Sequence, residues 1–145
     1  MEGAPDLSYV KALIVDDFQP TLDLTASMLR KYKMLVDCVS SGQEAVNLVK
    51  NGEPEYNLIF MDYMMPEMDG IEAVRQIRAI GTEYAKNLPV IALTGDETDS
   101  DGQMFLNSGF QLVLAKPISF EILNKFIKDW LIKNITKIND ASSSL

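Results

Sequence analysis

The sequence predicts an α/β protein organised around one five-stranded parallel sheet. Short apolar runs alternate along the chain with stretches whose apolar residues recur every three or four positions. The 145 residues, 47% of them hydrophobic and 23% charged, suit a single globular domain with its own core. Because a strand, a helix and a further strand form a right-handed unit with parallel strands, the alternation favours a parallel sheet with helices on both faces.

The strands are expected at residues 10–15, 34–39, 57–61, 89–93 and 112–115. Residues 58–61 read Leu-Ile-Phe-Met without a polar residue, which is typical of a strand buried on both faces. For five such strands we expect the order 2-1-3-4-5, the doubly wound arrangement called flavodoxin-like. The switch point of that order lies between the first and third strands.

Five helices are expected to connect and follow the strands. The first covers about 20–32 and begins at Pro20, a residue favoured in the first helical turn. The second has Ser41 as its N-cap and Glu44 three residues later, which is a capping-box pattern. The other three are expected over 70–79, over 99–107 with Gly109 at the C-terminal end, and from Ser119 to Leu131.

The chain is expected to contain one domain. We predict a flexible leader over residues 1–9, the domain over 10–133 and a polar C-terminal tail over 134–145, with no DNA-binding output segment. No leader with a charged and then apolar pattern opens the chain, and no apolar run approaches the roughly 18 residues of a membrane span. We therefore expect a cytoplasmic protein without membrane contact.

The charge and the rare residues exclude several functions. A formal net charge of −8 argues against nucleic acid or an anionic membrane as a partner. The chain has no histidine, so it offers no imidazole as a metal ligand, catalytic base or phosphohistidine. Its one cysteine, Cys38, allows no internal disulfide and is expected to be a small buried residue of the second strand. Composition makes no prediction about the oligomeric state.

Polar side chains stand at the carboxyl ends of four predicted strands. Asp16 and Asp17 follow the first strand, Asp62 ends the third, Thr94 follows the fourth and Lys116 follows the fifth. Because the carboxyl ends of parallel strands lie at one edge of a sheet, we expect these side chains to converge near the switch point. Taken alone, the aspartate pair suits a helix cap, the threonine a strand-end cap and the lysine a solvated charge, so the prediction depends on their convergence.

Such a group of side chains could hold a metal ion and a phosphoryl group. Three neighbouring carboxylates repel one another unless a positive charge joins them, and oxygen ligands with room for water suit Mg²⁺. A hard cation, the ammonium of Lys116 and the hydroxyl of Thr94 can together bind phosphoryl oxygens. Asp62 would then be placed to attack phosphorus in line.

The sequence resembles the receiver domain of two-component response regulators, a family with a CheY-like fold, over about residues 10–133. The resemblance rests on Asp16–Asp17, on the segment MDYMMPEMDG at 61–70, on Thr94 and on Lys116–Pro117. These features occur in the family's order and at about its spacings.

The resemblance implies roles for the individual residues. Asp62 is expected to be the phosphoacceptor, and Mg²⁺ is expected to bind Asp16, Asp17, Asp62 and the backbone carbonyl of Met64. Thr94 would bind the phosphoryl oxygens and report their arrival, and the side chain of Lys116 would pair with the aspartyl phosphate. The peptide bond between Lys116 and Pro117 is expected to be cis.

The resemblance also implies a partner and an output. The phosphoryl group would come from a phosphohistidine on a histidine kinase or a histidine phosphotransfer protein. The domain would catalyse its own phosphorylation and slow dephosphorylation, and would change partner binding through the predicted helix at 99–107, the fifth strand and the last helix. The chain would be either a stand-alone receiver or a part of a larger protein such as a hybrid histidine kinase.

One position departs from the common family pattern, and two others bear on the lifetime of the phosphorylated state. Many receivers have Tyr or Phe three residues before the lysine, and here the residue is Val113, so activation is expected to rely on the Thr94 loop and the following helix. In the family, the residues two positions after the phosphoacceptor and two after the threonine border the approach of water, and by resemblance these are Met64 and Asp96 here. Because a methionine side chain cannot orient water by hydrogen bonding, we expect slow self-dephosphorylation.

Three alternatives explain parts of the same sequence. A phosphatase or phosphotransferase of the haloacid-dehalogenase type also has an aspartyl nucleophile and Mg²⁺, but it requires a second acid where Met64 stands. An FMN-binding flavodoxin fits the strand order but requires a phosphate-binding loop after the first strand, which is missing. A calcium loop at 97–108 lacks its closing glutamate, because Ser108 occupies that position.

Overall fold

The computed structural model describes residues 5–95 and 102–134. The strands are β1 (Lys11–Val15), β2 (Leu35–Val39), β3 (Leu58–Asp62), β4 (Val90–Thr94) and β5 (Leu112–Ala115). The helices are α1 (Gln19–Arg30), α2 (Gly42–Asn51), α3 (Gly70–Ala79), α4 (Glu83–Asn87), α5 (Gly102–Ser108) and α6 (Phe120–Phe126), which continues into a π-helical turn, η1 (Ile127–Leu131).

The five strands form one parallel sheet in the order β2-β1-β3-β4-β5, which confirms the predicted fold. β3 and β4 lie inside the sheet, and all ten of their residues are buried. The register pairs Val15 with Met61 and Asp62 with Leu93. The residues that follow β1 and β3 therefore lie side by side at the carboxyl edge, where the strand order reverses.

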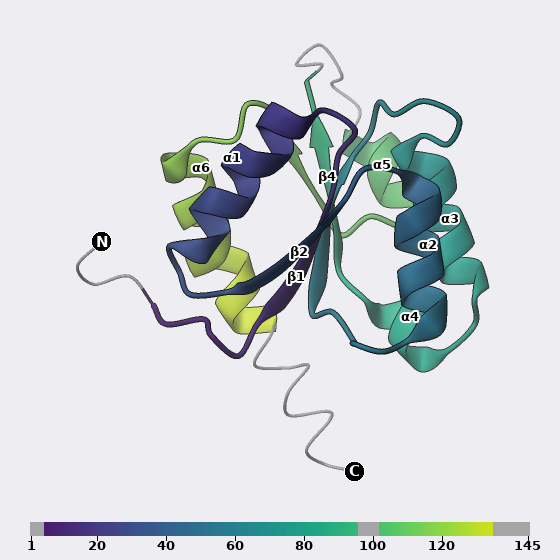
Figure 1. Cartoon of the computed structure of the whole chain (residues 1–145), viewed down its shortest axis with the longest axis horizontal. Helices are drawn as coiled ribbons and strands as arrows, with labels where there is room; N and C mark the ends of the chain where they lie inside the picture. Colours follow the sequence, from purple (N-terminus) through teal and green to yellow (C-terminus); the bar gives the residue numbers. More distant parts are fainter. Residues whose placement is uncertain (1–4, 96–101, 135–145) are drawn as a thin grey trace.

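Helices cover both faces of the sheet (Figure 1). On one face, α1, α6 and η1 enclose a core that includes Leu29, Phe60 and Phe126. On the other face, α2, α3, α4 and α5 enclose a second core that includes Met61, Ile77 and Phe105. We call these the first core and the second core. None of the described helices is long and apolar enough to cross a membrane.

Local hydrogen bonds explain where several helices begin. Ser41 Oγ accepts the backbone N–H of Glu44 at 3.2 Å, as the capping-box pattern predicts. The Glu44 carboxylate returns to the cap by accepting the Ser41 hydroxyl at 2.8 Å and the backbone N–H of Ser40 at 3.2 Å, one residue before the position that the pattern predicts. Asp69 caps α3 by accepting the N–H of Glu72 at 2.8 Å, and Ser119 caps α6. These caps fix the helix starts next to the ends of the strands.

The structure corrects the number and the ends of the helices. Six helices are present among the described residues instead of the predicted five, because α4 was not predicted. It is five residues long, is capped by Thr82 and buries only Ala85, so it leaves no apolar stripe in the sequence. The first helix ends at Arg30 rather than at residue 32. The predicted start of the helix at 99 and the first five residues of the alternative calcium loop at 97–108 lie outside the described residues.

The end of the predicted leader packs on the domain. The side chain of Leu7 is buried in the first core, and its N–H donates to the carbonyl of Tyr32 at 2.8 Å. The boundaries at residues 10 and 133 stay predictions. Cys38 lies in β2, as predicted, but it is only half-buried against the first core. Burial raises the pKa of its thiol.

Candidate functional site

The end of β1 supplies two carboxylates of different exposure. Asp16 is buried, and its Oδ1 accepts the N–H of Phe18 at 2.9 Å, which orients the carboxylate. Asp17 is exposed beside it. The two side chains leave a strand whose preceding four residues are all buried, so the sheet fixes the position of this end of the chain.

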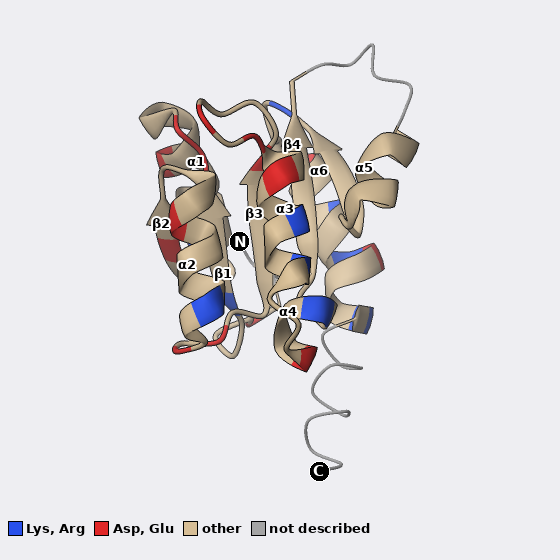
Figure 2. Cartoon of the chain, turned by 90° about the vertical axis from the view of Figure 1, so that its right-hand side faces the viewer, with Lys and Arg blue, Asp and Glu red and all other residues tan. Residues whose placement is uncertain are grey.

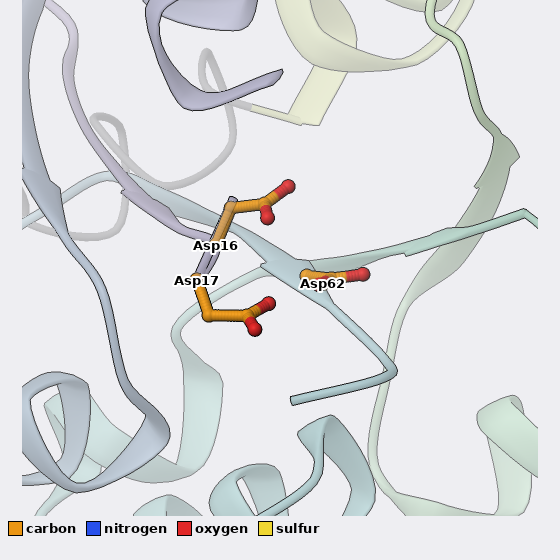
Figure 3. A group of neighbouring side chains, drawn as sticks. All are labelled: Asp16, Asp17 and Asp62. Carbon is orange, nitrogen blue, oxygen red and sulfur yellow. The ribbon is translucent and has the colours of Figure 1, made fainter. Parts of the chain in front are cut away.

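The end of β3 supplies the third carboxylate from the interior of the sheet. Asp62 is buried, and Figure 3 shows its side chain beside those of Asp16 and Asp17. The next residue, Tyr63, donates its N–H to the carbonyl of Leu93 at 3.0 Å and accepts the N–H of Gly70 at 2.8 Å. Both backbone bonds fix the chain directly after Asp62.

Lys116, the residue directly after the edge strand β5, joins the carboxylates. Its Nζ lies 2.8 Å from Asp62 Oδ1 and 2.9 Å from Asp16 Oδ2. Its backbone N–H donates to the carbonyl of Thr94 at 2.8 Å, and its bond to Pro117 is cis, as the resemblance implied. Thr94 is buried at the end of β4. The predicted carboxylates, threonine and lysine therefore all converge on one edge of the sheet.

The three carboxylates are arranged as a group that could hold a metal ion. One oxygen of each lies within 4.8 Å of the others. Asp16 Oδ2 is buried and, among the described residues, has the ion pair with Lys116 but no hydrogen bond with suitable geometry. A set of oxygen ligands with one exposed member suits a hard cation that keeps part of its water shell, as Mg²⁺ does.

Burial and neighbouring charges shift the pKa values of both partners in the ion pair of Asp62 with Lys116. Burial raises the pKa of Asp62, and the charges of Asp16 and Asp17 raise it further, although Lys116 opposes them. Burial alone would lower the pKa of Lys116, but hydrogen bonds to Asp16 and Asp62 outweigh it and raise the pKa. Lys116 therefore carries its charge at neutral pH and partly neutralises the acids.

Some features of the site were not predicted from the sequence. Lys116 was expected beside the phosphoacceptor, but its equally short contact with Asp16 was not foreseen. No local motif indicates that contact, which depends on the positions of β1 and β5 in the sheet. The side chain of Met64 is 71% exposed. The role of its backbone carbonyl stays a prediction.

The position of Val113 is aliphatic and half-buried against the second core. Aromatic rings lie nearby, but they come from other elements. Tyr63, directly after Asp62, packs edge-on against Phe105 of α5, and Phe105 packs edge-on against Phe110. No local motif in the sequence indicates the contact of Tyr63 with Phe105.

Comparison with known proteins agrees with this geometry. Residues 12–128 match the model of the response regulator receiver domain. The chain is 33% identical over 117 residues to hybrid signal transduction histidine kinase M of Dictyostelium discoideum, a match that covers 80% of this chain but 5% of the kinase. The chain thus spans a small part of that relative.

Solved structures give the same result. The magnesium-bound receiver domain of the sensor histidine kinase PA1611 from Pseudomonas aeruginosa superposes with a TM-score of 0.71 at 31% identity, covering 83% of this chain and 96% of that one. The receiver domain of Ssk1 from Saccharomyces cerevisiae, solved with the histidine phosphotransfer protein Ypd1, gives a TM-score of 0.72 at 35% identity, covering 83% and 88%. With its strand order, its acidic cluster and its sequence all in agreement, the chain belongs to the response regulator receiver domain family.

Proposed function

We propose that Asp62 accepts a phosphoryl group from a phosphohistidine and that the domain thereby carries a signal to a partner protein. The observation that supports this most directly is the position of Lys116, whose ammonium lies 2.8 Å from Asp62 and 2.9 Å from Asp16. A fixed positive charge beside a carboxylate nucleophile is what a transferred phosphoryl group needs, because its charge is spread over its outer oxygens.

The acidic cluster provides the metal site of this proposal. Asp16, Asp17 and Asp62, with the backbone carbonyl of Met64, would hold Mg²⁺. When bound, the ion would neutralise phosphoryl oxygens in the transition state. The receiver domain of PA1611 has magnesium in its active-site cleft, which supports the same cofactor here.

The residues of this chain would then act on the phosphoryl group directly. A carboxylate oxygen of Asp62 forms a bond to phosphorus while the bond from phosphorus to the imidazole nitrogen of the donor breaks. The imidazole, which carries a proton on its other ring nitrogen, leaves with that electron pair as the neutral ring. Lys116 retains its proton and pairs with a phosphoryl oxygen, and the hydroxyl of Thr94 donates to another. These steps make the domain the catalyst of its own phosphorylation.

An exposed apolar rim beside the carboxylates suits a protein donor. Phe18 is 60% exposed at the start of α1, and Met64 is 71% exposed in the segment after β3. Large apolar side chains at the edge of a polar site commonly contact a partner. The Ssk1 receiver domain binds the phosphotransfer protein Ypd1, which supports a histidine phosphotransfer protein or a histidine kinase as the donor here.

The wider context of this function follows from the relatives. The matched kinases are much longer than this chain, so the domain is proposed to act either alone or as a part of a hybrid histidine kinase. Its expected place is the cytoplasm. Phosphorylation is proposed to change the surface formed by α5, β5 and α6, where a partner would distinguish the two states.

The test is phosphorylation by a small acyl phosphate in the presence of Mg²⁺, followed by intact-protein mass. We expect the gain of one phosphoryl group in the natural protein, no gain in Asp62→Asn, and the usual gain in Asp69→Asn. The last variant is a matched control, because Asp69 caps α3 in the same connecting segment and asparagine also caps helices. A gain that persists in Asp62→Asn, or multiple turnover of a phosphoester, would contradict the proposal.

A further inference from the structure

A row of three aromatic rings runs from the acidic cluster to the helix α5. Tyr63 follows Asp62 directly, and its ring centroid lies 5.0 Å from that of Phe105 at an angle of 86°. Phe105 lies 5.7 Å from Phe110 at 81°. Edge-to-face pairs at these distances are favourable, and they depend on the mutual angle of the rings. Phe105 is fully buried, whereas Tyr63 is half-buried.

The backbone on both sides of Tyr63 is held by hydrogen bonds and by close packing against Gly70. The N–H and the carbonyl of Tyr63 are both hydrogen-bonded, to Leu93 and to Gly70. A Cβ added to Gly70 would lie 2.6 Å from the carbonyl oxygen of Asp62 and 3.1 Å from the Cα of Tyr63. The start of α3 therefore packs closely on the backbone of both residues, so a displacement of the Asp62 backbone would also move Tyr63.

The helix α5 is fixed at its C-terminal end. The guanidinium of Arg78 in α3 donates to the carbonyl of Gly109 at 2.7 Å and 3.3 Å. The N–H of Phe110 also donates to the carbonyl of Phe105 at 3.2 Å. Figure 2 shows α5 beside α3 at this side of the molecule. A lateral displacement of Phe105 would therefore tilt α5 about its anchored end.

We propose that Tyr63 is a positioning residue that transmits the state of Asp62 to α5 through the ring of Phe105. The inference rests on the proposed function and adds a route for its output. Because Val113 is aliphatic, it supplies no ring at the position where many receivers have one. Among the described residues, the contact of Tyr63 with Phe105 therefore provides an aromatic connection between the site and α5. Movement of α5 would shift Met104 and Leu106, which are 40% and 44% exposed, and so alter the apolar surface that a partner contacts.

The test compares amide hydrogen exchange in α5 with and without beryllofluoride and Mg²⁺. In the natural protein we expect the exchange rates over residues 102–108 to change by about threefold or more. Tyr63→Leu should bind beryllofluoride within about threefold of the natural affinity, measured by fluorine NMR, but should lose the change in α5. Tyr63→Phe keeps the ring and should keep the response.

A matched control and a second variant make the outcome specific. Trp130 is half-buried and stacks on Phe126 at 5.5 Å on the opposite face of the sheet, so Trp130→Leu should keep the α5 response. Phe105→Leu removes the other ring of the contact with Tyr63 and should also abolish the change in α5 exchange. Either variant can therefore test the contact if the other is unstable.

The outcomes separate the inference from the proposed function. A natural protein that binds no beryllofluoride would overturn the proposed function itself. If the adduct forms but α5 does not respond, or responds equally in Tyr63→Leu or Phe105→Leu, the inference is wrong and the phosphoacceptor role stands. A response lost equally in Trp130→Leu would also overturn it, because the loss would then not be specific to this row of rings.

Discussion

Replacing Gly70 by alanine tests how tightly α3 presses on the phosphoacceptor strand. The added Cβ would lie 2.6 Å from the carbonyl oxygen of Asp62, whereas ordinary contacts begin at 3.4 Å. Two of the three nearest atoms belong to the backbone and cannot rotate away. Overpacking of this kind costs about 1–3 kcal/mol, against a gain of up to ~1 kcal/mol from the better helix propensity of alanine.

We therefore expect Gly70→Ala to lower the free energy of unfolding by roughly 1–2 kcal/mol, measured by urea denaturation. Gly102→Ala is the matched control, because Gly102 also begins a helix, but none of the described atoms outside its own helix backbone and chain neighbours lies within 4 Å of its added Cβ. That variant should be neutral or slightly stabilising. Equal unfolding free energies for the two variants would refute the claim that the backbone after Asp62 is closely packed. The displaced strand end should also slow phosphorylation of Asp62.

Three further substitutions test other parts of the structure. Arg78→Lys should lower the free energy of unfolding by roughly 3 kcal/mol or more, because the guanidinium donates to the carbonyls of Ala85, Leu88 and Gly109. Arg75→Lys, an exposed change on the same helix, is the control. Equal unfolding free energies for the two variants would contradict this. Met64→Asn should shorten the lifetime of the phosphorylated protein severalfold, because an amide can orient water in the approach to Asp62; an unchanged decay of the phosphorylated mass would count against it. Tyr56 donates to Asp37 at 2.8 Å, and burial, with this bond, raises the pKa of its phenol. The phenol of the unfolded chain, with a pKa of about 10, ionises first, so the free energy of unfolding should fall above about pH 10, and the fall should be smaller in Tyr56→Phe. Parallel stability profiles for the two proteins would disprove this contribution.

The sequence predicted the sheet because the signals for its strands are local. The buried run at 58–61 and the alternation of strands and helices lead directly to a parallel order, and the helix over 70–79 ends at Ala79 as predicted. The helix α4 was missed because a five-residue helix that buries one alanine has no periodicity to detect. The π-helical turn after Phe126 was missed for a related reason, since its apolar residues fit a continuous helix equally well.

The site was predictable as a set of residues, but its contacts were not. Positions at strand ends follow from topology, so Asp62 and Lys116 could be assigned to one edge of the sheet. The bridge from Lys116 to Asp16, and the contact of Tyr63 with Phe105, depend on side-chain directions across elements far apart in the sequence. Such directions are set by packing of the whole domain rather than by a local motif.

The buried side chain of Leu7 has a practical consequence for anyone who grafts this domain onto another protein. A graft that starts at Val10 would leave an empty volume in the first core and would remove the N–H that Tyr32 accepts. Loss of one leucine from a core costs about 2–5 kcal/mol, a large share of the stability of a small domain. The transferable unit therefore begins before Leu7, ahead of the first strand.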